Sequence, residues 1–373
     1  MKFTVLQSDL AKFISYVGRI VDSKPSLPVL GNILIDAQTD KIILMATNLE
    51  ITTHIKIPAS VTEMGVTTVP ARTFSEYILS LTDGTIELVK KGQVLSVTAG
   101  SSSAQFNTMN PDNFPQMPES KGDPEMVFNA GELKTAMELV TFSAGVDATS
   151  PVFTGVYLAS CEEGVSFVST DGYRLSRYTL KIKDKSQKLP WLIPVKALKE
   201  FLKFVAGSQS DNLVNFYLVS NSKQLLIEYK NIKMYTRLIE GEFPDYKAVI
   251  PTTHQTTVEM DFESFREVIK QVNIFARDIP GNKVLMTVNA KEKKVFFEAT
   301  LAEVGSNKST LTSNIEGNDL KIMFSAKQLS DFISNIQAEK IHFEGSTSES
   351  AGVFKIVGND NYIHIIMPMT LGN

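Results

Sequence analysis

The sequence predicts an α+β protein made of three tandem copies of one domain, each with two helices packed on antiparallel sheets. One helical pattern occurs three times, and a second pattern ahead of it repeats with nearly the same period. Short strand-like runs separated by turn residues fill most of the remaining chain. The period is too long for a solenoid, whose units span roughly 20–50 residues, and is typical of a domain.

The repeated helical pattern starts at residues 69, 193 and 324, which are 124 and 131 residues apart. In the first copy, apolar residues between positions 74 and 81 fall at i, i+3, i+4 and i+7, which indicates an amphipathic helix. Pro70 and Pro194 are suited to the first helical position, and Ser325 to the N-cap. Each copy has a base, an acid four positions later and then an aromatic residue: Arg72, Glu76, Tyr77; Lys196, Glu200, Phe201; Lys327, Asp331, Phe332.

The second pattern is an apolar residue five positions before another apolar residue at a helix start. It occurs at Val5 and Leu10, Phe128 and Leu133, and Met260 and Phe265. The second members are 123 and 132 residues apart, close to the period of the first pattern. Two independent landmarks with one period predict three domains, over residues 1–122, 123–250 and 251–373.

Composition excludes several classes of protein. The net charge of −4 gives no sign of nucleic-acid binding, because most DNA-binding proteins are basic. The single cysteine, Cys161, cannot form an internal disulfide and favours a reducing compartment. No apolar run is long enough to cross a membrane, and the N-terminus has charges where a signal peptide needs apolar residues. We therefore expect a cytoplasmic protein with no membrane partner.

The elements of the first copy follow in order. We expect a strand over 2–6, a helix capped by Ser8, and a proline-stiffened loop over 23–32 with Lys24 near its tip. Strands over 33–36, 41–47 and 50–57 precede the repeated helix. A hairpin turning at Lys91–Gly92, a strand over 104–109 and a turn-rich linker over 110–124 complete the copy.

The second and third copies repeat this plan. The second has a helix over 130–142, the repeated helix from Pro194 and a hairpin turning at Asn221–Ser222. Its strands are predicted over 152–159, 165–170 and 175–183, with another ending at 237–238. The third has a helix over 262–275 and the repeated helix, with strands over 284–289, 294–299, 340–344, 352–357 and 362–367. Phe-Pro pairs at 114–115 and 243–244 mark the two linkers.

Catalytic motifs are missing from the sequence. It has no phosphate loop, HExxH or GxSxG motif, and its four histidines lack metal-ligand spacing. We therefore expect no enzyme activity, no metal and no cofactor. The most distinctive polar cluster is TDGYRL over 170–175, which on local grounds predicts a tight turn at Asp171–Gly172 between two strands.

The triplicated unit, together with ARTF, TDGYRL, FPDY and the C-terminal MPMTL, resembles the bacterial sliding clamp family, the beta subunit of DNA polymerase III. LPVLGN, VPAR, STDGYRLS, EFPDY and MPM occur in the expected order, and the resemblance covers essentially the whole chain. It implies a processivity factor whose DNA-clamp domains close into a ring as a head-to-tail homodimer around duplex DNA. The implied partners are the replicative polymerase, the clamp loader and other proteins with a clamp-binding motif. Contacts to DNA would be to phosphates, without sequence specificity.

The resemblance also implies three sets of site residues. A peptide-binding pocket would be lined by Thr170, Gly172, Tyr173, Arg174, Leu175, Pro244, Val249, Met367, Pro368, Met369 and Leu371. DNA contacts would come from a loop residue and from the polar faces of helices, namely Lys24, Lys12, Arg72, Lys196, Lys199, Lys203 and Lys327. The dimer contact would include Phe106, Ile274 and Phe275.

Some positions depart from the family pattern, and alternatives stay open. Tyr173 stands where many relatives have His, Thr370 where Arg is frequent, and residues 372–373 extend past the usual last Leu. Met367 and Met369 also fit plain packing at the end of a strand. One rival function is a triplicated protein-binding scaffold without DNA. Another is a hydrolase that uses an acid pair such as Asp171 with Asp245.

Overall fold

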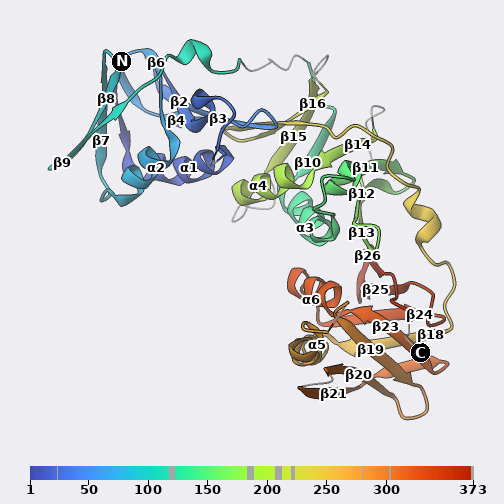
Figure 1. The fold of residues 1–373 in the computed structure, drawn as a ribbon. Helices are drawn as coiled ribbons and strands as arrows, with labels where there is room; N and C mark the ends of the chain where they lie inside the picture. Colours follow the sequence, from blue (N-terminus) through green and yellow to red (C-terminus); the bar gives the residue numbers. More distant parts are fainter. Residues whose placement is uncertain are drawn as a thin grey trace. The chain divides into compact units, whose positions relative to one another are not determined.

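The computed structural model describes residues 1–22, 24–116, 122–182, 189–205, 212–219, 223–279, 281–301 and 304–370 (Figure 1). The chain forms two compact units, one of residues 1–131 and 196–238 and the other of residues 132–195 and 239–373. The elements of the central copy are therefore shared between the two units.

The first unit contains two antiparallel sheets. The five-stranded sheet has the order β5-β1-β7-β8-β9, with β1 Lys2–Leu6, β5 Ser60–Glu63, β7 Thr85–Lys91, β8 Val94–Ala99 and β9 Ser102–Asn107. The eight-stranded sheet has the order β10-β15-β16-β17-β4-β3-β2-β6, with β2 Asn32–Gln38, β3 Lys41–Thr47, β4 Ile51–Pro58, β6 Gly65–Pro70, β10 Met126–Asn129, β15 Leu213–Val219, β16 Gln224–Tyr229 and β17 Ile232–Arg237. Strand β4 of the first copy pairs with β17 of the second, with Ile55 opposite Ile232, so one sheet joins two copies.

The second unit repeats this construction. Its nine-stranded sheet has the order β14-β11-β12-β13-β26-β25-β24-β18-β22, with β11 Gly155–Cys161, β12 Gly164–Thr170, β13 Arg174–Leu180, β14 Trp191–Pro194, β18 Thr256–Asp261, β22 Asn314–Gly317, β24 Lys340–Gly345, β25 Gly352–Ile356 and β26 Asn359–Ile366. The four-stranded sheet has the order β21-β20-β19-β23, with β19 Lys283–Asn289, β20 Lys294–Leu301, β21 Gly305–Thr312 and β23 Leu320–Ser325. Strand β13 pairs with β26, with Leu175 opposite Ile365, which joins the second copy to the third.

Six α-helices in the described residues confirm two helices per copy: α1 Gln7–Ile20, α2 Ala71–Ser80, α3 Ala130–Val140, α4 Val195–Val205, α5 Phe262–Ala276 and α6 Ala326–Asn335. In the first copy α1 lies against α2, and a Cβ added at Gly18 would be 3.0 Å from the Ser75 hydroxyl. In the third copy α5 lies beside α6 (Figure 1). Each helix buries an apolar stripe, as the amphipathic patterns predict. None of the helices in the described residues is long and apolar enough to cross a membrane.

The predicted helix starts need small corrections. Helix α1 begins at Gln7 without a side-chain cap, so Ser8 is not its N-cap. The buried Gln7 amide donates instead to the carbonyl of Ile78, 3.0 Å away, which binds α1 to α2. Pro70 and Pro194 each precede the first helical residue, because both still belong to strands. Ser325 is the N-cap of α6, but its side chain makes no capping hydrogen bond.

The strand predictions were wrong in three places. Residues 152–154, expected to start a strand, belong to a 3₁₀ turn (η4, Pro151–Thr154), because Pro151 fixes φ and has no N–H for a ladder. The first hairpin turns at Gly92–Gln93, since Lys91 still pairs with Val94 and Gly92 has a φ of +58°. Strands β5, β6, β10, β14, β18 and β21 to β23 were not predicted. The expected turn at residues 221–222 lies outside the described residues.

Candidate functional site

The turn between β12 and β13 is built around one carboxylate, as the predicted tight turn requires. Asp171 Oδ1 accepts hydrogen bonds from the backbone N–H groups of Tyr173 at 2.9 Å and Arg174 at 3.0 Å. The Thr170 hydroxyl accepts from the N–H of Gly172 at 3.0 Å and donates to the carbonyl of Arg174 at 2.6 Å. Gly172 has a φ of +89°, a conformation that favours glycine. These bonds hold residues 170–174 in one shape.

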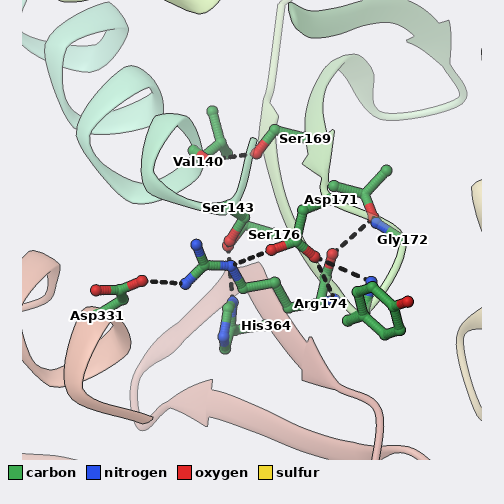
Figure 2. Close-up of polar contacts among 11 residues, drawn as sticks. Val140, Ser143, Ser169, Asp171, Gly172, Arg174, Ser176, Asp331 and His364 are labelled. Carbon is green, nitrogen blue, oxygen red and sulfur yellow. Dashed lines mark hydrogen bonds and ion pairs between the residues drawn. The ribbon is translucent and has the colours of Figure 1, made fainter. Parts of the chain in front are cut away.

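Arg174 connects this turn to helix α6. Its Nε donates to Asp171 Oδ2 at 2.9 Å, and its Nη1 donates to Asp331 Oδ2 at 2.6 Å (Figure 2). The guanidinium also lies 5.9 Å from the ring centre of Phe142. The Arg174 side chain is only 9% exposed, so its charge needs close partners. Two carboxylates, from Asp171 and Asp331, meet that need.

A chain of buried polar groups lies beside Arg174. The hydroxyl of Ser176 is 2.7 Å from that of Ser143 and 2.8 Å from Nδ1 of His364 (Figure 2). Ser169 donates to the carbonyl of Val140, which ties β12 to α3. The His364 ring stacks on Phe332 with centroids 4.8 Å apart. Burial, and then the charge of Arg174, lower the pKa of His364 to about 3, so the ring is neutral at neutral pH.

A cavity of about 240 Å³ opens beside this turn, where β13 meets β26. Eight of the eleven predicted pocket residues line it: Thr170, Gly172, Tyr173, Arg174, Leu175, Pro244, Val249 and Met367. The exposed side chains of Tyr173, Val249 and Met367 supply large apolar surfaces that are not otherwise covered. Beneath them, Leu175 and Ile365 belong to a buried apolar cluster of the sheet. The cavity is therefore suited to an apolar side chain or short apolar segment.

Three predicted pocket residues are not among the lining residues. Pro368 and Met369 follow β26, and the N–H of Met369 donates to the carbonyl of Met323 at 2.8 Å, which directs this segment toward β23. Leu371 lies outside the described residues. The sequence analysis missed four lining residues, Phe153, Asp245, Tyr246 and Ile365. The FPDY motif contains a signal for Asp245 and Tyr246, whereas Phe153 stands in a 3₁₀ turn with no local signal.

The acid pair of the hydrolase alternative is engaged elsewhere. Asp171 organises its own turn and Arg174, and Asp245 accepts a hydrogen bond from the N–H of Lys247 at 3.1 Å as the cap of η5 (Tyr246–Val249). Each carboxylate thus has a separate local partner. Across the part of the chain that the structure describes, no three His, Cys, Asp or Glu side chains are grouped to hold a metal ion.

The seven cations predicted to contact DNA lie on α1, α2, α4, α6 and the loop after α1. All are exposed except Lys203, which is half-buried and bonded to Glu200 at 2.6 Å. Arg72 pairs with Glu76 at 3.0 Å, and Lys196 lies 4.0 Å from Asp22. Among the described residues, Lys12, Lys24, Lys199 and Lys327 have no ion-pair partner, although the Lys12 ammonium lies 5.4 Å from the Phe13 ring centre. In the first unit, α1 also meets α4 through the rings of Tyr16 and Phe204, 4.8 Å apart.

The three predicted dimer residues lie next to sheet edges. Phe106 is on β9, an edge strand of the five-stranded sheet, and packs within its own unit at 5.3 Å from the Phe74 ring. Ile274 on α5 is 58% exposed. Its neighbour Phe275 lies beside Gly305, the first residue of edge strand β21, where an added Cβ would be 3.9 Å from the ring.

Comparison with known proteins identifies relatives over the full chain. Sequence profiles of the DNA polymerase III beta subunit match in tandem: the N-terminal domain over residues 1–118, the central domain over 128–245 and the C-terminal domain over 247–370. The chain is 27% identical to the beta sliding clamp of Chlamydia muridarum, covering 100% of this chain and 99% of that protein. It is also 27% identical to the beta sliding clamp of Staphylococcus aureus, with 99% of each covered.

Solved structures show the same fold. The DNA polymerase sliding clamp of Bacillus subtilis matches with a TM-score of 0.93 at 22% identity, covering 100% of both chains. A sliding clamp of Pseudomonas aeruginosa bound to griselimycin matches with a TM-score of 0.91 at 24% identity, again over 100% of both chains. The predicted architecture of three tandem clamp domains is confirmed by these matches.

Proposed function

Because the chain belongs to the DNA polymerase III beta subunit family, the family of the beta sliding clamps, we propose that it is a non-catalytic processivity factor for a DNA polymerase. As a ring around duplex DNA it tethers the replicative polymerase and other replication and repair proteins. The observation that carries this proposal is the tandem match of three clamp domains along nearly the whole chain. It acts in the cytoplasm, needs no cofactor of its own, and depends on a clamp loader to open the ring.

The cavity between β13 and β26 is the proposed docking site for partner peptides. Its apolar floor and the exposed rim of Tyr173, Val249 and Met367 fit a short segment containing Leu and Phe. A flexible methionine at the rim can adapt to several related sequences. The site thereby serves several partners in turn.

The internal repeat supports a head-to-tail dimer. Strands β4, β13 and β21 occupy the same place in the three copies of the repeat, and so do β9, β17 and β26. One strand of each set pairs at both junctions inside the chain, β4 with β17 and β13 with β26. This leaves β21 of the first set and β9 of the second. Both are edge strands, with unpaired backbone groups that favour strand addition. We propose that β21 of each chain pairs with β9 of the other chain in the dimer, near Phe106, Ile274 and Phe275, which closes the ring.

The helices carry the proposed DNA contacts. Lysine outnumbers acid most clearly on α4, which has Lys196, Lys199 and Lys203 against Glu200. Together with Lys12, Lys24, Arg72 and Lys327, these side chains face the phosphates of the enclosed duplex. Such contacts position DNA without reading its sequence, so the ring can slide.

Two measurements test the proposal. Light scattering over a concentration series should give twice 41.2 kDa. After loading by a clamp loader, the protein should stay on closed circular DNA through a salt wash and leave once the DNA is cut. A monomer at every concentration contradicts the ring. Equal loss from circular and cut DNA also contradicts it, and favours the DNA-free scaffold if peptide binding persists.

A further inference from the structure

One column of the internal repeat has acquired a different contact in each copy. The acid of the repeated helix is Glu76 in α2, Glu200 in α4 and Asp331 in α6. Glu76 pairs with Arg72, and Glu200 with Lys203, both on their own helices and within one turn. Asp331 instead bonds Arg174, which is 157 residues away in the sequence and lines the cavity. The third copy thus has a contact with a pocket residue where the first two copies have a pair within one helix.

The Asp331 contact continues into the pocket wall through a short relay. Asp331 holds Nη1 of Arg174, whose Nε holds Asp171 (Figure 2). The other oxygen of Asp171 accepts the N–H groups of Tyr173 and Arg174, which shapes the turn. The carbonyl of Tyr173 in turn accepts the N–H of Met367 at 2.8 Å. Both rim residues, Tyr173 and Met367, are therefore connected to α6 through consecutive hydrogen bonds.

We propose that Asp331, which is absent from the cavity lining, is a positioning residue that sets the geometry of the peptide pocket through Arg174. This inference rests on the proposed peptide-docking function. Arg174 is nearly buried, so it cannot exchange Asp331 for bulk water without moving. Replacing Asp331 by Asn removes the negative charge and leaves Asp171 as the sole carboxylate on the guanidinium among the described residues. The guanidinium then shifts toward solvent and takes Asp171 and the turn with it.

The test is a titration in which full-length protein is added to a short fluorescein-labelled peptide ending in Leu-Phe, and binding is measured as the fluorescence anisotropy of the peptide. Asp331→Asn should weaken binding about tenfold, the scale of one partly buried charge-assisted hydrogen bond. Asp331→Glu restores the carboxylate and should recover most of the affinity. Glu200→Gln is the matched control, because it removes the acid from the same repeat position without touching the pocket, and should bind as the parent does.

A double-mutant cycle separates positioning from a general loss of stability. If Asp331 acts through Arg174, then Asp331→Asn should have almost no further effect on affinity in an Arg174→Ala background. Additive losses, or unchanged affinity in the single variant, overturn the inference. Fluorescence of the single tryptophan, Trp191 in the same sheet, verifies that each variant is folded. A second peptide, in which Ala-Ala replaces Leu-Phe, tests the docking function itself. If the parent protein binds the Leu-Phe peptide no better than the Ala-Ala peptide, the proposed docking function is wrong.

Discussion

At the scale of single residues, the described part of the second unit concentrates its polar chemistry at one junction. Arg174 bonds Asp171 and Asp331, and beside it Ser176 bonds His364; these side chains come from two copies of the repeat. Such a cluster is compatible with a stable fold only when its charged members have partners, because an unpaired buried charge destabilises the folded state. The same network that joins the two copies therefore also shapes the adjacent cavity.

The buried histidine should make the second unit sensitive to acid. The folded state lowers the pKa of His364 to about 3, so between that value and the ordinary value near 6.5 the unfolded chain binds more protons. Stability should fall as pH drops through this window, by about 2–3 kcal/mol from pH 6.5 to pH 4.5. Urea unfolding followed by Trp191 fluorescence measures it. His364→Asn should lower stability at pH 7 but flatten the dependence on pH; an unchanged slope rules out His364 as the cause.

Substitutions of Met367 and Met369, in the C-terminal segment, should differ in their effect on peptide binding. Met367 lines the cavity and is partly exposed, so Met367→Ala should cost about 1–2 kcal/mol of binding free energy through lost apolar contact. Met369 bonds to Met323 through its backbone, which survives substitution, so Met369→Ala should change affinity by less than about 0.5 kcal/mol. Anisotropy titrations with one labelled peptide compare them. A larger loss for Met369→Ala would place the bound peptide further along the C-terminal segment.

At the scale of elements, neighbouring copies of the repeat are joined by the strands at their borders, although it was the helices that revealed the repeat. Two junctions inside the chain are made by continuous antiparallel sheet, β4 with β17 and β13 with β26. Ladder hydrogen bonds satisfy the edges and fix the register of neighbouring copies. Strands β9 and β21 have a neighbour on one side only among the described residues, which is why the proposed dimer contact uses them.

A charge beside the β21 edge should separate the proposed dimer. Ile274→Asp should weaken self-association at least about tenfold, because the carboxylate must be desolvated when the surface is covered. Light scattering at falling protein concentration should then show a 41.2 kDa species where the parent remains at twice that mass. Leu79→Asp, at a similarly exposed leucine on α2, is the control and should leave the mass unchanged. Equal behaviour of the two variants would remove Ile274 from the interface.

At the scale of the whole molecule, net charge hides local charge. The chain carries −4 overall, yet α4 has three lysines against one glutamate. A protein that holds DNA by enclosing it needs few strong contacts, and an acidic total charge limits unproductive sticking to nucleic acid. For the proposed DNA contacts, the position of the lysines therefore matters more than their total number.

The salt dependence of DNA binding should report individual lysines. Lys199 is exposed and has no ion-pair partner among the described residues, so Lys199→Gln should reduce the slope of log K against log salt by about 1 if it contacts one phosphate. Lys291→Gln, in the exposed turn between β19 and β20, is the control and should leave the slope unchanged. Anisotropy titrations of a short linear duplex, on which topology does not hold the ring, provide the data over a salt series. Matching slopes for both variants would exclude Lys199 as a phosphate contact.

The sequence by itself determined the repeat, the two helices of each copy and most of the strands, because apolar periodicity and turn residues are local signals. The resemblance carried by TDGYRL, FPDY and MPM also predicted eight residues of the cavity wall. Local signals could not reveal that Phe153 joins that wall, that Met369 turns toward β23, or that Ser8 caps nothing.

The contrast is clearest in the acidic column of the repeated helix. Sequence alone treats Glu76, Glu200 and Asp331 as equivalent, since each follows a base by four positions. The tertiary structure gives the first two a partner on their own helix and gives Asp331 the buried Arg174. The partner of a charged side chain depends on which groups the packed strands bring within about 3 Å and how far they exclude water, and neither is written in local sequence.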